Sequence, residues 1–194
     1  DWIAPGILAM KTKVAYCITE PEAGTDVSGI RTTATRDGDG WVLNGGKIWI
    51  HNAPVADLGF VLARTDKEAG NRGMSIFIVD LHAAGVERGP KEHKMGQRAS
   101  QVGALNFQDV KLGADALLGQ ENRGFHMMMS VLDKGRVGIA ALAVGIGQAG
   151  LEAAVDYAGQ RKQFGKTIAE FQGVQWLLAD MAKDIEAARL LVHN

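Results

Sequence analysis

The stretch from Ala15 to Ile30, AYCITEPEAGTDVSGI, combines features that suit a ligand rich in hydrogen-bond acceptors. An apolar run ends at Thr19-Glu20-Pro21 and passes into a turn of small and hydroxyl-bearing residues. Gly24 permits close approach of a ligand to the backbone, and Thr25 offers a side-chain donor. The simpler interpretation is a strand followed by an ordinary loop. The segment is therefore the first candidate for a binding site.

A second candidate lies at Lys47 to Asn52, KIWIHN, where an indole and an imidazole stand on one predicted strand. A wide planar ligand can stack on such aromatic groups. Further along, Arg161, Lys162 and Lys166 form a cationic loop that either neutralises a phosphate or is simply solvated.

Two nucleotide-binding patterns are imperfect matches. The segment Gly145 to Gly150 fits GxGxxG, but the residues before it continue a helical pattern, whereas that fingerprint requires a preceding strand. Close packing of helices on small residues is the favoured interpretation. The segment Gly159 to Thr167 resembles a P-loop but has one residue too many between its glycines. Hydrolysis of nucleoside triphosphates is therefore not expected.

Composition excludes several other classes of protein. The chain has 21 Lys and Arg against 22 Asp and Glu, which lacks the positive charge of a nucleic-acid binder. Cys17 is the single cysteine and no histidines form a close pair, so neither a disulfide nor a metal site is expected. The longest uncharged stretch, Val137 to Leu151, is shorter than the roughly 20 residues that cross a bilayer, so no membrane span is expected.

The elements that position these residues differ between the two parts of the chain. Lys13 to Leu112 reads as β-structure, with a hairpin turn at Asp37 to Gly40 and a second turn at Asn44-Gly45-Gly46. Further strands are expected within this part at Leu58 to Ala63, Ser75 to Val79 and Ala104 to Phe107. Several antiparallel strands without intervening helices predict a small barrel or sandwich.

After Gly119 the apolar residues recur at helical spacing. Long helices are predicted over Gly124 to Gln160 and Ala169 to Leu191, joined by a loop at Arg161 to Thr167. The chain opens without an initiator Met and stops inside a helical pattern at Asn194, so we expect a piece of a longer polypeptide.

Five motifs occur in an order that identifies a family: AYCITEPEAGTD, WVLNGGKIWIHNA, KMGQRAS, LDKGR and RKQFGKTIAEFQ. Together they resemble the acyl-CoA dehydrogenase family over essentially the whole chain. The resemblance implies an α+β multidomain fragment. Residues 1–120 would be the antiparallel β-barrel or sandwich middle domain, which binds flavin and acyl-CoA. Residues 121–194 would be the first two long helices of a C-terminal four-helix bundle.

The resemblance also implies FAD as cofactor and a fatty acyl-CoA thioester as substrate. A carboxylate would remove the α-proton while the β-hydrogen leaves as hydride to flavin N5, which gives the trans-2-enoyl-CoA. An electron-transfer flavoprotein would accept the electrons. The family implies a homotetramer, a dimer of dimers, in the bacterial cytoplasm or the mitochondrial matrix. Two alternatives stay open: an acyl-CoA oxidase or flavin monooxygenase on the same fold, or a non-catalytic subunit.

The site residues implied by the resemblance come from separate segments. The FAD contacts are Tyr16, Cys17, Ile18, Thr19, Gly24, Thr25, Trp49, Ile50, His51, Arg161, Lys162, Gln163, Phe164, Phe171 and Gln172. Those from Arg161 onward would reach the FAD of a neighbouring subunit. The acyl-CoA contacts are Thr25, Asp133 and Arg136, although a surface ion pair on a helix also explains the last two.

The chain departs from the family pattern at two positions. Most members carry Thr or Ser where this chain has His51, and we hypothesise that His51 tunes the flavin. The usual catalytic Glu is expected beyond Asn194, and the alternative place for it, immediately before Arg136, holds Gly135. No catalytic residue is therefore predicted within the chain, and Glu20 belongs to the flavin turn.

Overall fold

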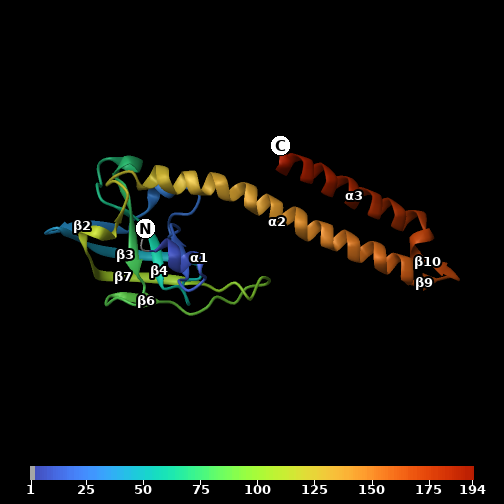
Figure 1. Cartoon of the computed structure of the whole chain (residues 1–194), viewed down its shortest axis with the longest axis horizontal. Helices are drawn as coiled ribbons and strands as arrows, with labels where there is room; N and C mark the ends of the chain where they lie inside the picture. Colours follow the sequence, from blue (N-terminus) through green and yellow to red (C-terminus); the bar gives the residue numbers. More distant parts are fainter. Residues whose placement is uncertain (1–2) are drawn as a thin grey trace. The chain divides into compact units, whose positions relative to one another are not determined.

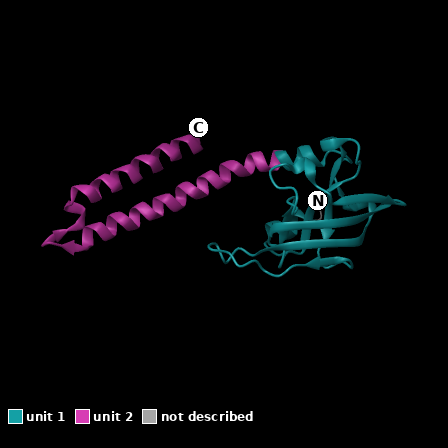
Figure 2. Cartoon of the chain, turned by 180° about the vertical axis from the view of Figure 1, so that it is seen from behind, with its two compact units in different colours: residues 1–129 teal, residues 130–194 magenta. Residues whose placement is uncertain are grey.

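The computed structural model describes residues 3–194, which form two compact units. Of the described residues, 3–129 form one unit and 130–194 the other (Figure 2). Their boundary falls inside the helix α2 (Gly124–Gln160), which begins in the first unit and continues in the second. The division at residue 120 that the sequence indicates stays a prediction about domains.

The first unit is built on one eight-stranded sheet (Figure 1). Its strands are β1 (Val14–Cys17), β2 (Thr33–Asp37), β3 (Gly40–His51), β4 (Leu58–Arg64), β5 (Met74–Asp80), β6 (Val86–Arg88), β7 (Val102–Leu112) and β8 (Leu117–Leu118). Their order is β6-β7-β3-β2-β4-β5-β8, and β1 pairs with β4. Short helical turns complete the unit: α1 (Ala4–Leu8) and 3₁₀ turns at Val27–Gly29, Gly70–Gly73 and Ala114–Ala116.

The predicted β-rich unit followed by two long helices is confirmed, but its strands are not all antiparallel. β1 pairs with β4 in parallel, from Val14 opposite Leu58 to Cys17 opposite Val61. The strands follow an open path and not a closed barrel. Parallel neighbours need a long connection, which the hairpin of β2 and β3 supplies here. The apolar alternation of a strand is the same for parallel and antiparallel pairing. The parallel pairing of β1 with β4 therefore could not be predicted from the alternation.

The predicted turn at Asp37 to Gly40 is correct, whereas the second turn at Asn44-Gly45-Gly46 is wrong. β3 continues through that segment with a register shift against β7 between Leu43 and Gly45. Gly45 has φ +142°, and a Cβ there would lie 2.5 to 2.8 Å from atoms of Thr32. The glycines therefore serve a β-bulge with a close backbone approach and do not reverse the chain.

The core of the first unit lies on one face of β3 and its neighbours. Trp41 and Leu43 of β3 are buried, and the Trp41 ring meets Phe77 of β5 edge to face, with centroids 5.1 Å apart. The guanidinium of Arg36 lies 3.9 Å from the centroid of the Trp41 ring, on the outer side of the cluster. These contacts join side chains of β2, β3 and β5 in one cluster.

The second unit is a pair of helices, the body of α2 and α3 (Gln172–His193), joined by a short hairpin. The predicted loop between them contains β9 (Lys162–Gln163), β10 (Lys166–Thr167) and a 3₁₀ turn at Ile168–Glu170. Arg189 of α3 donates to Gln148 of α2 at 2.8 Å, and Gly147 lies against Ile185. The GxGxxG segment is therefore helical, as the sequence favoured, and Gly147 is the glycine of the motif that packs against the other helix.

The helix α2 is also long and apolar enough to cross a membrane by length and composition. One window of 18 residues reaches a mean hydropathy of 1.5. A core helix of a helical bundle meets the same two criteria, so these features do not assign α2 to a bilayer. The absence of a membrane span stays a prediction.

Candidate functional site

Three successive residues of the turn after β1 are held against β3. The Ile48 amide donates to the Thr19 carbonyl at 2.9 Å. The Lys47 ammonium donates to the Ile18 carbonyl at 2.9 Å and to the Glu20 carboxylate at 2.8 Å. The two sequence segments singled out as binding candidates therefore lie side by side in the structure.

The Glu20 carboxylate is fully engaged at the centre of this turn. It accepts hydrogen bonds from the backbone amides of Arg31 at 2.6 Å and Thr32 at 3.0 Å, besides the one from Lys47. Burial, the largest influence, favours the neutral acid, but the Lys47 charge and these hydrogen bonds together hold the pKa of Glu20 below 4.5. Burial likewise lowers the pKa of Lys47, and the attraction of Glu20 opposes this shift.

We expect the stability of the first unit to depend on pH through Glu20. Because its folded pKa lies below the unfolded value near 4.5, the ionised carboxylate stabilises the fold above that pH. This contribution is lost as the pH falls through the folded pKa. Urea unfolding between about pH 3 and pH 7 measures it. Glu20→Gln should weaken the dependence of the free energy of unfolding on pH in that range. If this variant lost as much stability at low pH as the unmodified protein, the assignment of the effect to Glu20 would be contradicted.

The part of β3 beyond Lys47 presents an aromatic side chain to solvent. The register against β7 shifts again between Lys47 and Ile50, and Trp49 in between has φ +60° and is 57% exposed. A left-handed conformation is strained for a large side chain and is held only by well-defined surroundings. Next to it, His51 Nδ1 and Ser100 Oγ form a hydrogen bond at 3.1 Å. The bulge thus exposes an indole and an imidazole together.

The other predicted residues of this region divide by burial. The side chains of Cys17, Ile18 and Ile50 are buried, so only their backbone is available to a ligand. Burial raises the pKa of the Cys17 thiol to about 12 and keeps it neutral. Gly24 and Thr25 are exposed, and a Cβ at Gly24 would meet nothing within 4 Å. The turn is therefore open to a ligand on its outer side.

Tyr16 connects β1 to the start of α2. Its hydroxyl donates to the Met128 carbonyl at 2.9 Å, and burial raises the pKa of Tyr16 to about 12. The hydroxyl is therefore a neutral donor at physiological pH. The donor of this hydroxyl is already used by Met128, and the role of Tyr16 in FAD binding stays a prediction.

We expect Tyr16→Phe to lower the free energy of unfolding by about 1 kcal/mol, because it leaves the Met128 carbonyl without this donor. Urea denaturation measures the change. Tyr157→Phe is the matched control, since Tyr157 is 61% exposed, and its effect should stay within about 0.5 kcal/mol. Equal effects of the two substitutions would contradict the proposed role of the hydroxyl.

The predicted residues in the second unit lie on exposed surfaces. Arg136 Nε and Asp133 Oδ1 are 3.5 Å apart on α2, with both side chains about three-quarters exposed. The surface ion pair therefore exists, and a role in binding acyl-CoA stays a prediction. At the hairpin, Phe164 is 93% exposed and meets Phe171 edge to face at 6.2 Å. The Lys166 ammonium lies 4.5 Å from the centroid of the Phe171 ring.

The hairpin is held by a capping box. Thr167 and Glu170 exchange hydrogen bonds, with the Glu170 carboxylate accepting from the Thr167 amide at 2.9 Å. The Arg161 carbonyl accepts from the Ile168 amide at 2.8 Å, and the Arg161 amide donates to Tyr157. A fixed backbone thus carries exposed cationic and aromatic side chains from Arg161 to Phe171.

Sequence reasoning missed two residues. They are Lys47, the buried partner of Glu20, and Ser100, the hydrogen-bond partner of His51. The sequence motif indicates Lys47 only as the beginning of a strand with aromatic residues, although alternation from Leu43 predicts an inward side chain at this position. That conflict between residue type and strand position is the signal for a buried charge. Ser100 belongs to the KMGQRAS motif, but its contact with His51 has no local signal.

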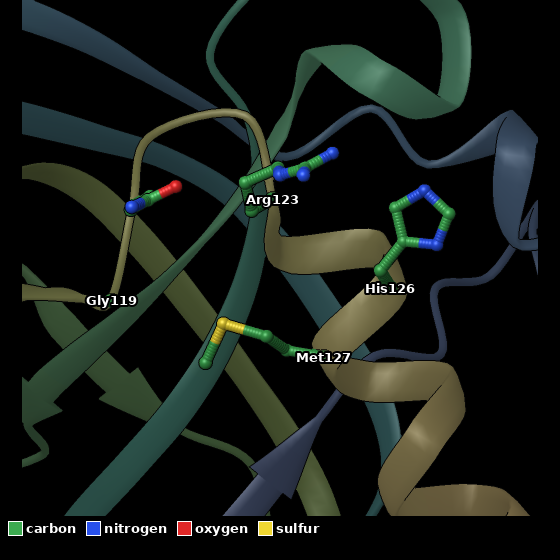
Figure 3. Close-up of a pocket in the computed structure, with 5 residues that line it drawn as sticks. Gly119, Arg123, His126 and Met127 are labelled. Atoms are coloured by element: carbon green, nitrogen blue, oxygen red, sulfur yellow. The ribbon is translucent and has the colours of Figure 1, made fainter.

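Two pockets lie elsewhere in the first unit. One of about 450 Å³ is lined by Gly119, Gln120, Arg123, His126 and Met127, around the start of α2 (Figure 3). The other, of about 720 Å³, is formed by the loop from Lys91 to Arg98. None of the predicted site residues lines either pocket. Within residues 3–194, no three His, Cys, Asp or Glu side chains gather as a metal site.

Comparison with known proteins accounts for this arrangement. Residues 15–110 match the acyl-CoA dehydrogenase middle domain, and residues 122–194 match the acyl-CoA dehydrogenase C-terminal domain. The caffeyl-CoA reductase-Etf complex subunit CarC of Acetobacterium woodii is 46% identical over 188 residues, which cover 97% of this chain and 50% of that protein. The short-chain specific acyl-CoA dehydrogenase of Megasphaera elsdenii is 50% identical over 181 residues, 93% of this chain and 47% of that protein.

The solved structures agree with the sequence matches. The structure of butyryl-CoA dehydrogenase from Megasphaera elsdenii superposes with a TM-score of 0.94 at 47% identity, and covers 97% of this chain and 49% of that one. The chain spans about half the length of the curated relatives it matches. Both parts of the chain match the same family in sequence, and the fold matches it as well. The chain therefore belongs to the acyl-CoA dehydrogenase family.

Proposed function

We propose that this chain provides the flavin-binding and part of the substrate-binding surface of an FAD-dependent acyl-CoA dehydrogenase. The reaction is the oxidation of an acyl-CoA thioester to the trans-2-enoyl-CoA. The observation that carries the proposal is the contact between the turn at Ile18 to Glu20, the Thr19 turn, and the bulge between Lys47 and Ile50, the Trp49 bulge. It joins the two segments to which family resemblance assigns the flavin ring.

The residues of the first unit fit an isoalloxazine ring in kind. The Trp49 indole offers an exposed aromatic surface, Gly24 leaves the backbone open, and Thr19 and Thr25 carry hydroxyls. In the second unit, Arg161 and Gln163 offer exposed donors that suit a pyrophosphate of a neighbouring subunit's cofactor. Bound FAD supplies the acceptor for the β-hydrogen, which leaves the substrate as hydride.

The chain's own residues bind and orient the substrate in this proposal. Thr25, Asp133 and Arg136 contact the acyl-CoA, with the last two on one face of α2. A carboxylate removes the α-proton, and we propose that it is contributed from outside residues 1–194, because Gly135 stands before Arg136. Glu20 is excluded as this base, since its carboxylate is buried and bound to Lys47 and two amides.

Further partners follow from the same proposal. An electron-transfer flavoprotein takes up the electrons, supported by a relative whose name describes an Etf complex subunit. The chain acts in a homotetramer in the bacterial cytoplasm or the mitochondrial matrix. Large apolar side chains on both long helices are exposed, and we propose that further helices of a bundle cover them. They are Val131, Val137, Ile139, Leu142, Ile146, Val155, Tyr157, Trp176, Leu177, Leu190 and Leu191.

The absorption spectrum of the purified protein, followed by anaerobic titration with acyl-CoA thioesters of increasing chain length, tests the proposal. Oxidised flavin bands that bleach with one thioester would support a dehydrogenase and identify its substrate class. Stoichiometric peroxide on aerobic turnover would instead favour an oxidase. Flavin that no thioester bleaches would favour a non-catalytic subunit, and failure to bind added FAD would contradict the cofactor assignment.

His51→Thr is expected to change the rate of flavin reduction by substrate. An imidazole is larger than a threonine side chain and offers two ring nitrogens where threonine offers one hydroxyl. Rapid-mixing measurements of flavin bleaching check this expectation. His82→Thr, another exposed histidine of the first unit, is the control and should leave the rate unchanged. A His51→Thr rate identical to that of the unmodified protein would end the hypothesis.

A further inference from the structure

The side chain of Lys47 is a buried charge whose position the proposed reaction does not explain. Its side chain is 0% exposed, and that of its partner Glu20 is 5% exposed. Apolar residues of similar volume would fill this space without the desolvation cost of two charges. Stability alone therefore does not explain this ion pair, and its geometry indicates a further role.

The ammonium of Lys47 binds the two residues on either side of Thr19. It donates to the carbonyl of the residue before Thr19 and to the carboxylate of the residue after it, at 2.9 and 2.8 Å. Only a turn that places Ile18 O and Glu20 Oε1 together satisfies both donors. Any other course of the turn leaves a buried ammonium without acceptors, which is costly. Lys47 therefore selects one conformation of the Thr19 turn.

Lys47 also forms the N-terminal end of the Trp49 bulge. The register against β7 is regular at Lys47, opposite Leu105, and is regained at Ile50, opposite Gly103. Between them, Ile48 donates its amide to Thr19, and Trp49 takes φ +60°. The bulge can keep this strained conformation only if both of its ends are held. Lys47 holds the first end and the buried Ile50 the second.

We propose that Lys47, through Ile18 and Glu20, is a positioning residue that fixes the Thr19 turn and the Trp49 bulge relative to each other. The relevance of this coupling to flavin rests on the proposed function, whereas the coupling of the two segments does not. Glu20 extends the coupling to Arg31 and Thr32, so the whole loop that contains Gly24 and Thr25 is tied to β3.

The test compares Lys47→Met, the double variant Lys47→Met/Glu20→Leu and the control Lys111→Met. The double variant leaves no unpaired buried charge and is the decisive one if Lys47→Met alone does not fold. Lys111 of β7 pairs with Asp37 of β2 at 2.7 Å, with both side chains more than half exposed. It matches the residue type and the sheet but has no buried partner.

Two measurements separate positioning from general stability. In the absence of FAD, amide hydrogen exchange of peptides spanning residues 18–25 and 47–52 should be at least about tenfold faster in the double variant, while strands β4 and β5 stay protected. In titrations with FAD, the Kd of the double variant should be about tenfold higher or more, and the fine structure of the visible spectrum of its FAD-bound form should change. Lys111→Met should match the unmodified protein in both.

A folded double variant with unchanged exchange in both peptides would overturn the proposal. Unchanged exchange with weaker FAD binding would overturn it as well, because the coupling would then not be the cause. If the unmodified protein binds no FAD, the proposed function fails, and the exchange measurement alone still decides whether Lys47 couples the two segments.

Discussion

Trp41→Ala is expected to lower the free energy of unfolding by about 3–5 kcal/mol, among the largest effects of any single change in the first unit. Trp41 is 2% exposed, and its ring packs edge to face against Phe77 at 5.1 Å. The substitution removes the transfer free energy of the indole and leaves a cavity between β3 and β5. Denaturation in urea, followed by circular dichroism, measures the loss.

Trp49→Ala is the matched control for this prediction. Trp49 is the same residue type on the same strand but is 57% exposed. Its replacement should change the free energy of unfolding of the FAD-free protein by less than about 1 kcal/mol. Similar losses from the two substitutions would mean that the exposed bulge contributes to the core, in contradiction to the structure.

Arg161→Met is expected to weaken FAD binding about 10- to 100-fold without lowering the stability of the FAD-free protein. A charge-assisted hydrogen bond to a pyrophosphate is worth about 1.5–3 kcal/mol. The Arg161 side chain is exposed, and both of its backbone groups are hydrogen bonded, so its removal should leave the hairpin intact. Titration of the FAD-free protein with FAD, followed by flavin fluorescence, gives the Kd.

Lys183→Met supplies the control for Arg161, because Lys183 is an exposed cation on α3 outside the predicted contacts. Its FAD affinity should match that of the unmodified protein. The loss at Arg161 should also shrink as salt is raised, since salt screens exposed charges. Equal affinities of the two variants would remove Arg161 from the proposed cofactor site.

The sequence predicted the elements whose pattern is local. The Asp37 to Gly40 hairpin has its turn residues in place, and α2 begins at Gly124, where the helical spacing of apolar residues starts. The helical nature of Gly145 to Gly150 also followed from neighbouring residues alone. In each case the necessary interactions join residues close together in the chain, so a short window contains the information.

The features that escaped prediction depend on partners far away in sequence. The parallel pairing of β1 with β4 is invisible in either strand alone. The bulge at Gly45 depends on the approach of Thr32, and a glycine cluster without that neighbour reads as a turn. The burial of Lys47 contradicts the general preference of lysine for the surface and is explained only by Glu20 and Ile18.

The buried ammonium of Lys47 also has a consequence for how the chain folds. β3 is long, and an alignment shifted by one residue would exchange its inward and outward side chains. Such a shift would turn Lys47 toward solvent and leave the Glu20 carboxylate enclosed without its cation, while apolar neighbours alone would tolerate the error more easily. The ion pair thus adds an electrostatic cost to any misaligned pairing of β3 and favours the one alignment seen in the structure.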